Sequence, residues 1–223
     1  MTEFFLVRHA DNDWASAGRL AGWTPGVHLN PHGRLQAQAL AERLAALQVA
    51  AIYSSPLERT VETAEAIVTR LPGVAVQLLQ GVGEVRFGQW EGKPLGKLRR
   101  EALWKDIQTH PSRVTFPDGE SFRQAQARAV DALESLAVRH PRQHIIVVSH
   151  SDVIKLVLAH FLGMHLDLFQ RIEISPASLS VIHLAAGRPT IRCINDTAHL
   201  PSRPPQRGRR TVWRRLSRLA HWR

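Results

Sequence analysis

The sequence lacks several features, and each absence excludes a class of protein. Cys193 is its only cysteine, so neither an intrachain disulfide nor a cysteine-ligated metal cage can form. No stretch approaches the roughly 18 uninterrupted apolar residues that a transmembrane helix requires. The first residues also lack the basic start and apolar core of a secretory leader. We therefore expect a cytoplasmic protein with no integral membrane segment.

Acidic residues are missing from one end of the chain. Residues 201–223 contain eight arginines and no Asp or Glu, which leaves two of the ten net positive charges for the rest of the sequence. Residues 1–200 are thus nearly neutral and predict one domain, whereas 201–223 predict a basic, Arg-rich, flexible tail. Apolar residues recur at helical spacing from Val212 to Ala220, so the tail could weakly contact an anionic membrane or a nucleic acid. A purely solubilising tail is the alternative.

Residues 1–200 alternate between short apolar runs and segments of helical periodicity. Apolar residues make up 44% of the chain and charged residues 22%, a composition that can bury one substantial core. The alternation predicts an α/β fold, a three-layer sandwich with a mostly parallel central sheet flanked by helices. The expected strands are 3–7, 49–53, 74–79, 144–148 and a final pair at 179–184 and 190–194, and the expected helices are 30–47, 55–71, 97–108, 120–139 and 152–162.

Two of the expected helices have clear start signals. Asn30 is a good N-cap residue, and Pro31 suits the first helical turn that follows it. The run Ser55–Glu58 has the pattern of a capping box, with Ser55 as the N-cap and Pro56 as the first helical residue. We therefore expect helices to begin at these two places.

Cations and histidines follow three of the predicted strands. Arg8 and His9 follow the first strand, Arg59 lies shortly after the second, and His150 follows the central strand. Ligands of parallel α/β sheets bind beyond the carboxyl ends of the strands, so these side chains are expected to converge there. Two arginines can bind phosphate oxygens as forks, while one imidazole attacks phosphorus and the other donates a hydrogen bond. This combination favours a phosphoryl group as the ligand.

Four segments, in order along the chain, carry a more specific pattern. They are Leu6–Ala10 (LVRHA), Ser54–Thr60 (SSPLERT), Gly83–Gly92 (GEVRFGQWEG) and Val148–Ser151 (VSHS), and Pro117–Ser121 (PDGES) is a further one. Together they resemble the successive motifs of the histidine phosphatase superfamily, the phosphoglycerate-mutase-like group, and of its phosphatase branch in particular. The resemblance covers residues 3 to about 195.

The resemblance implies three catalytic residues. His9 matches the nucleophile that takes the phosphoryl group and becomes phosphohistidine. Glu84 matches the acid that protonates the leaving oxygen and later activates water. His150 matches the second histidine of the pocket, which stabilises the group in transfer. Each role suits the residue type, since a histidine nucleophile must be neutral and a carboxylic acid must be protonated when it donates.

The resemblance also implies a set of phosphate-binding residues. Arg8 and Arg59 match the phosphate-binding arginines, and His150 joins them. Asn12 stands where the family often has Thr or Ser near the phosphate. No cofactor is expected, and no metal either, because the sequence offers no H-x-x-x-H helix or carboxylate cluster.

We therefore expect a metal-independent phosphomonoesterase that acts on a small phosphorylated metabolite through a phosphohistidine intermediate. Two alternatives stay open, namely a phosphoglycerate-mutase-type isomerase and a non-catalytic scaffold that works through its basic tail. The 66 positions from Glu84 to His150 favour the phosphatase, because the family's bisphosphoglycerate-dependent mutases usually carry a longer insertion there. Neither the particular phosphomonoester nor the oligomeric state follows from the sequence.

Overall fold

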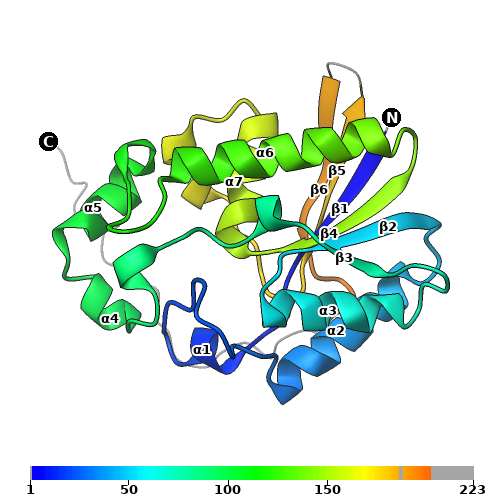
Figure 1. Ribbon diagram of the computed structural model, residues 1–223, viewed down its shortest axis with the longest axis horizontal. Helices are drawn as coiled ribbons and strands as arrows, with labels where there is room; N and C mark the ends of the chain where they lie inside the picture. Colours follow the sequence, from blue (N-terminus) through cyan, green and yellow to red (C-terminus); the bar gives the residue numbers. More distant parts are fainter. Residues whose placement is uncertain (1, 186–187, 202–223) are drawn as a thin grey trace, which may run out of the picture.

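A six-stranded sheet forms the centre of the computed structural model, which describes residues 2–185 and 188–201 (Figure 1). The strand order is β3-β2-β4-β1-β5-β6. The first four strands in this order run parallel, whereas β5 is antiparallel to β1 and β6 is antiparallel to β5. The prediction of a mostly parallel sheet is therefore confirmed. The strands are β1 Thr2–Arg8, β2 Val49–Ser54, β3 Val76–Leu78, β4 His144–Ser149, β5 Leu179–Ala185 and β6 Arg188–Asp196.

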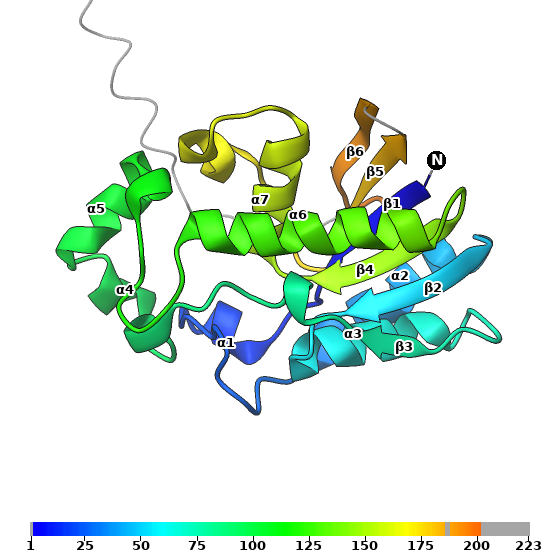
Figure 2. The same cartoon turned by 45° about the horizontal axis from the view of Figure 1, so that its top comes forward.

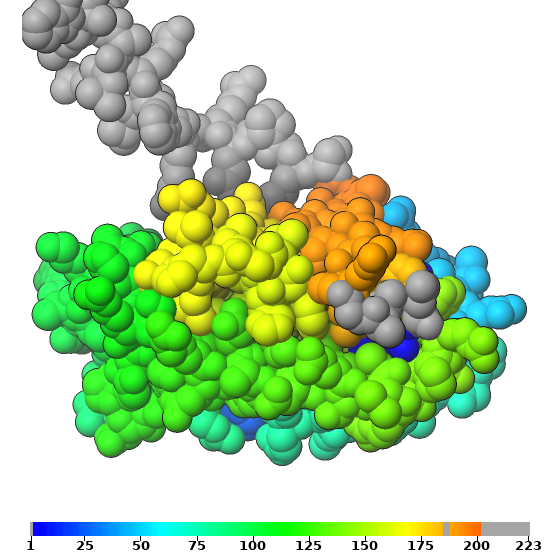
Figure 3. Space-filling view, turned by 90° about the horizontal axis from the view of Figure 1, so that it is seen from above, coloured from blue at the N-terminus to red at the C-terminus, as the bar shows by residue number. Residues whose placement is uncertain are grey.

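Helices cover both faces of the sheet, which confirms the three-layer sandwich (Figure 2). Along β1, Phe5 and Val7 pack toward α2 (Pro31–Leu44) and α3 (Glu58–Val68), whereas Phe4 and Leu6 pack toward the opposite face. That face is covered by α6 and α7, which contact each other. In the space-filling view the green surface of the segment that contains α6 lies beside the yellow surface of the segment that follows it in the chain (Figure 3). A strand buried on both sides must be apolar at every position, and this explains the unbroken runs in β1 and β4. The two helices are α6 Phe122–Arg139 and α7 Ser151–Phe161.

Short helices lie beyond the carboxyl ends of the parallel strands (Figure 1). The prediction of one helix over 97–108 is wrong, because the chain forms two helices there. Leu98 and Ile107 are both buried, yet positions nine residues apart lie on opposite faces of a continuous helix. The break lets both side chains turn inward. The expected loop 10–29 also contains one helical turn. These helices are α1 Asp13–Ser16, α4 Leu95–Leu98 and α5 Ala102–Thr109, and the 3₁₀ turns are Gln80–Val82, Gly88–Trp90, Pro111–Arg113 and Leu166–Arg171.

The two expected helix starts have different outcomes. Asn30 caps α2 as predicted, since its Oδ1 accepts a hydrogen bond from the Gly33 amide at 2.7 Å. The predicted capping box at Ser55 is wrong. Helix α3 begins at Glu58, two residues after the predicted start at Pro56, and its N-cap Leu57 makes no side-chain cap. The Ser55 hydroxyl instead contacts a histidine of the site described below.

The predicted basic tail lies outside the described residues, and so do the apolar positions from Val212 to Ala220. The turn expected between the last two strands falls largely on residues 186–187, which also lie outside them. Within the described ranges, no helix has the length and apolar character needed to cross a membrane.

Candidate active site

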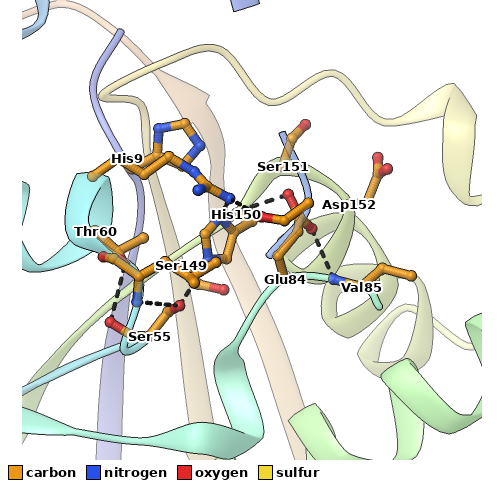
Figure 4. A network of polar contacts seen from close by, with 12 residues as sticks. His9, Ser55, Thr60, Glu84, Val85, Ser149, His150, Ser151 and Asp152 are labelled. Atoms are coloured by element: carbon orange, nitrogen blue, oxygen red, sulfur yellow. Dashed lines mark hydrogen bonds and ion pairs between the residues drawn. The ribbon is translucent and has the colours of Figure 1, made fainter. Parts of the chain in front are cut away.

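The polar residues predicted at the three strand ends converge at one edge of the sheet (Figure 4). Strands β1 and β4 pair in parallel with Arg8 opposite Ser149, so the next residues, His9 and His150, emerge side by side. The His9 amide donates to the Ser149 carbonyl at 2.9 Å, and the two imidazole centroids lie 5.3 Å apart. The sheet register therefore determines the spacing of the two rings.

His9 is buried and its tautomer follows from one contact. Its Nδ1 lies 2.8 Å from the Ala10 carbonyl oxygen. Since a carbonyl only accepts, Nδ1 carries the proton and Nε2 keeps its lone pair in the neutral ring. Burial lowers the pKa of His9 well below its usual value, and the charges of Arg59 and Arg8 lower this pKa further. The ring is thus neutral at physiological pH, as a histidine nucleophile must be.

Arg8 and Arg59 each have one buried guanidinium nitrogen without a hydrogen-bond partner in the described residues. Arg8 Nη1 donates to the Ile174 carbonyl at 2.7 Å, and Arg59 Nη2 donates to the Gly22 carbonyl at 2.9 Å. Arg8 Nε and Arg59 Nη1 are buried and have no hydrogen-bond partner among the described residues. Burial lowers the pKa of both groups, but guanidinium stays charged in proteins. Buried cationic donors of this kind favour binding of an anion.

His150 is fully buried, and both of its ring nitrogens have contacts. Arg59 Nη2 lies 3.3 Å from Nδ1, and Ser55 Oγ lies 2.8 Å from Nε2. Guanidinium only donates, so Nδ1 accepts and the Nε2 proton points to the serine. Burial, followed by the charge of Arg59, lowers the pKa of His150 well below its usual value. A hydroxyl both donates and accepts, so Ser55 allows the ring to reverse its tautomer and offer Nδ1–H to an anion.

Glu84 lies beside these residues with its side chain 13% exposed. Its Oε1 accepts from the Val85 amide at 3.0 Å, and its Oε2 lies 3.6 Å from His150 Nδ1. Burial raises the pKa of Glu84 to about 7, and the negative charge of Asp152 adds to the rise, whereas Arg59 opposes it. At neutral pH the carboxyl is therefore present in both its acid and base forms, which suits general acid–base catalysis.

A cavity of about 310 Å³ brings the predicted residues together. Asn12 caps α1, because its Oδ1 accepts from the Ala15 amide at 3.0 Å, and this leaves its amide nitrogen as the donor it can offer. His150 adjoins the cavity through its contacts with Arg59 and Glu84. The predicted residues that line the cavity are Arg8, His9, Asn12, Arg59 and Glu84.

The cavity wall also carries two charged residues that the sequence analysis did not single out. Asp152, in the first turn of α7, forms an ion pair with Lys155 at 3.3 Å. Arg19 donates from Nε and Nη2 to the Gly92 carbonyl, at 3.2 and 2.8 Å. Nothing in the sequence distinguishes them from ordinary surface charges. Within residues 2–185 and 188–201, no three His, Cys, Asp or Glu side chains form a group that could hold a metal ion.

Comparison with known proteins identifies the chain's relatives. Residues 4–197 match the sequence model of the histidine phosphatase superfamily (branch 1). The chain belongs to this superfamily. It is 33% identical to phosphoserine phosphatase 1 of Hydrogenobacter thermophilus, over 90% of this chain and 95% of that protein. It is 31% identical to the metal-independent phosphoserine phosphatase of Arabidopsis thaliana, over 91% of this chain and 84% of that protein. The solved structure of Bacillus stearothermophilus YhfR superposes with a TM-score of 0.84 at 29% identity, covering 89% of this chain and 99% of that one.

These relationships confirm the predicted reaction class of this histidine phosphatase. It is a hydrolase of phosphomonoesters, and the reaction of its superfamily passes through a phosphohistidine. The family comparison also confirms the predicted fold.

The sequence analysis missed Arg128, which fixes the loop that carries Glu84. Arg128 lies on α6. Trp23 Nε1 donates to the Glu84 carbonyl as well, at 2.7 Å. Arg128 donates from Nη1 and Nη2 to the carbonyls of Gly81, Gly83 and Glu84 at 2.7, 2.9 and 2.9 Å. No sequence signal marks Arg128, because it lies 44 residues from Glu84 on an amphipathic helix.

Proposed function

We propose that His9 takes the phosphoryl group from a small phosphomonoester and then releases it to water. In the first step the Nε2 lone pair of His9 attacks phosphorus, and the bond from phosphorus to the ester oxygen breaks. In the second step a water oxygen attacks phosphorus, and the bond from phosphorus to Nε2 breaks. The observation that carries this proposal is the state of His9, which is buried and neutral near the charges of Arg8 and Arg59. Its Nδ1 donates to the Ala10 carbonyl, so Nε2 keeps the lone pair that a nucleophile needs.

Arg8, Arg59, Asn12 and His150 bind the transferring group in this proposal. Charge in the transition state spreads over the three equatorial oxygens of phosphorus, so prearranged donors around them lower the barrier. The buried Arg8 Nε and Arg59 Nη1, which have no partner in the described part of the chain, are the first such donors. In its other neutral tautomer His150 offers Nδ1–H to the anion, and the Ser55 hydroxyl then donates to Nε2.

Glu84 moves the protons in both steps. Its protonated form donates to the ester oxygen as that oxygen leaves as an alcohol. The resulting carboxylate then takes a proton from the attacking water, which restores the acid. A pKa of about 7 supports both roles, because each form is available near neutral pH. The dianionic substrate beside Glu84 favours the acid form further during the first step.

Phosphoserine is the first substrate to test. The two curated relatives above are phosphoserine phosphatases and match most of this chain. Asp152 and Arg19 put one negative and one positive side chain on the cavity wall, which suits the ammonium and carboxylate groups of an amino acid. 3-Phosphoglycerate has no ammonium group and tests the mutase alternative directly.

We also propose that residues 1–200 form the catalytic domain and that 201–223 are an accessory segment. Leu200 packs against the apolar cluster of Ala10, Leu29, Ala37 and Ala177, which supports a domain boundary just after it. A chain that ends at Pro201 is expected to retain full phosphatase activity. Loss of activity in this truncated chain, with its fold intact by circular dichroism, would contradict the boundary.

The decisive assay measures phosphate release from p-nitrophenyl phosphate and phosphoserine in excess chelator. We expect turnover in the unaltered protein and none in His9→Ala. Turnover that survives in His9→Ala would exclude His9 as the nucleophile. Conversion of 3-phosphoglycerate to 2-phosphoglycerate faster than phosphate release would favour the mutase instead.

A further inference from the structure

A second hollow adjoins the catalytic cavity. Its volume is about 160 Å³, and Leu20, Phe87, Leu95 and Asp152 line both spaces. The two hollows therefore adjoin along these four residues, which places the second one next to the cavity that His9 lines. We call this second hollow the aromatic chamber.

The walls of the aromatic chamber are mostly apolar, and five of the lining residues are aromatic. Trp90 and Trp104 stack with their centroids 6.3 Å apart, and Phe116 packs edge-on against Trp90 at 5.6 Å. Phe122 and Ile107 complete this lining, and both are buried. Polar groups enter the lining only at a few positions, which leaves the chamber suited to an apolar occupant.

The size of the chamber limits what it can hold. An apolar cavity of about 150 Å³ in another protein binds benzene, so a hollow of this volume accommodates one six-membered ring. Phosphoserine has three carbons and no ring, so it offers nothing that would fill an apolar hollow of this size.

We propose that the aromatic chamber binds the apolar ring of a phosphomonoester while its phosphate lies beside His9. The ligand class is a phosphomonoester whose alcohol carries one aryl or cycloalkyl ring on a short linker. This inference rests on the proposed phosphatase function, since that function places the phosphoryl group in the adjoining cavity. The ring displaces water from an apolar surface, and this provides the extra affinity.

Phosphonates test the chamber without turnover, because their carbon–phosphorus bond is not hydrolysed. Isothermal titration calorimetry would compare methylphosphonate with benzyl-, 2-phenylethyl- and 3-phenylpropylphosphonate. Burial of one ring predicts that at least one aryl ligand binds about 10- to 100-fold more tightly than methylphosphonate. Equal affinity for all four ligands would overturn the inference and mark the chamber as a packing defect only.

Two variants that fill the chamber locate the ring. Ile107→Trp and the milder Ile107→Phe place a larger side chain on its wall, and Lys105→Trp adds the same bulk to the exposed side of α5 as a matched control. We expect the filling variants to lose the advantage of the aryl ligand and to keep their affinity for methylphosphonate. An advantage that persists in both folded variants would overturn the inference.

The same set of experiments separates this inference from the proposed function. The binding assay requires no chemistry, whereas the phosphatase function is judged by turnover of phosphoserine and p-nitrophenyl phosphate. Tight binding of an aryl phosphonate, with no turnover of phosphoserine or p-nitrophenyl phosphate, would support the inference about the chamber and contradict the phosphatase function. Turnover of these substrates, with no tighter binding of the aryl ligands, would support the phosphatase function and contradict the inference about the chamber.

Discussion

The protonation of Glu84 predicts how the activity of this phosphatase changes with pH. In the proposed mechanism the acid form protonates the leaving oxygen, and the raised pKa means that this form is populated below about pH 7 and lost above it. With a pKa of about 7, the acid fraction is about 0.9 at pH 6 and about 0.1 at pH 8. The kcat/KM for phosphoserine should therefore fall about 10-fold over this interval.

Glu84→Gln provides the reference for this measurement. Phosphate groups of substrates titrate near pH 6, but the ratio of kcat/KM between the unaltered protein and Glu84→Gln cancels that contribution. The variant should lose about 100- to 10,000-fold at pH 6 with phosphoserine, the usual contribution of a general acid. A ratio that stays constant from pH 6 to pH 8 would refute the reasoning.

The leaving group supplies a second check on the same residue. Since p-nitrophenolate leaves without a proton, phosphorylation of His9 by p-nitrophenyl phosphate should be nearly unaffected in Glu84→Gln. Attack by water should still be slow because the base is missing, so rapid mixing should show a burst of p-nitrophenolate. A variant with equally slow phosphorylation by both substrates would mean that Glu84 positions the substrate and does not protonate it.

Three further predictions concern the phosphate site and the core. Arg59→Lys keeps one positive charge but loses the fork, so the inhibition constant of inorganic phosphate should rise about 10- to 100-fold, and an unchanged constant would contradict the proposed contact. Ser55→Ala should lower kcat about 5- to 100-fold in the otherwise unaltered protein and hardly at all in the His150→Ala variant. Ser54 is equally buried and serves as the control, so Ser54→Ala should not lower kcat in either protein. An equal loss from Ser55→Ala in both proteins would make Ser55 a structural residue only. Leu133→Ala on α6 should reduce the free energy of unfolding in urea by about 2–5 kcal/mol without changing KM, because this side chain is 1% exposed and remote from the cavity lining.

Much of the fold and part of the candidate site could be predicted from local sequence. Unbroken apolar runs mark β1 and β4 because a strand covered on both faces is apolar at every position. Parallel strands end at the same edge of a sheet, so the order of elements alone predicted that His9 and His150 would meet. The Asn30 cap was also predictable, since a cap and its partner lie three residues apart.

The remaining features depend on contacts between residues far apart in the chain. Ser55 has the local pattern of a helix cap, yet its hydroxyl forms a hydrogen bond with His150, 95 residues away, and α3 begins only at Glu58. The pKa of Glu84 follows from burial and from Asp152, neither of which a one-dimensional pattern contains. The aromatic chamber is lined by residues as far apart in the chain as Leu20, Trp104 and Gln170, which only the tertiary fold brings together.

The sequence by itself determined most of the strands and long helices, their order and the residue types at the strand ends, because periodicity, capping and motif spacing act over a few neighbouring residues. Only the tertiary structure decided the tautomers of His9 and His150, the acidity of Glu84 and the shape of the space around the phosphate. Those properties arise from desolvation and from donors and acceptors brought together by packing, which act through space and not along the chain.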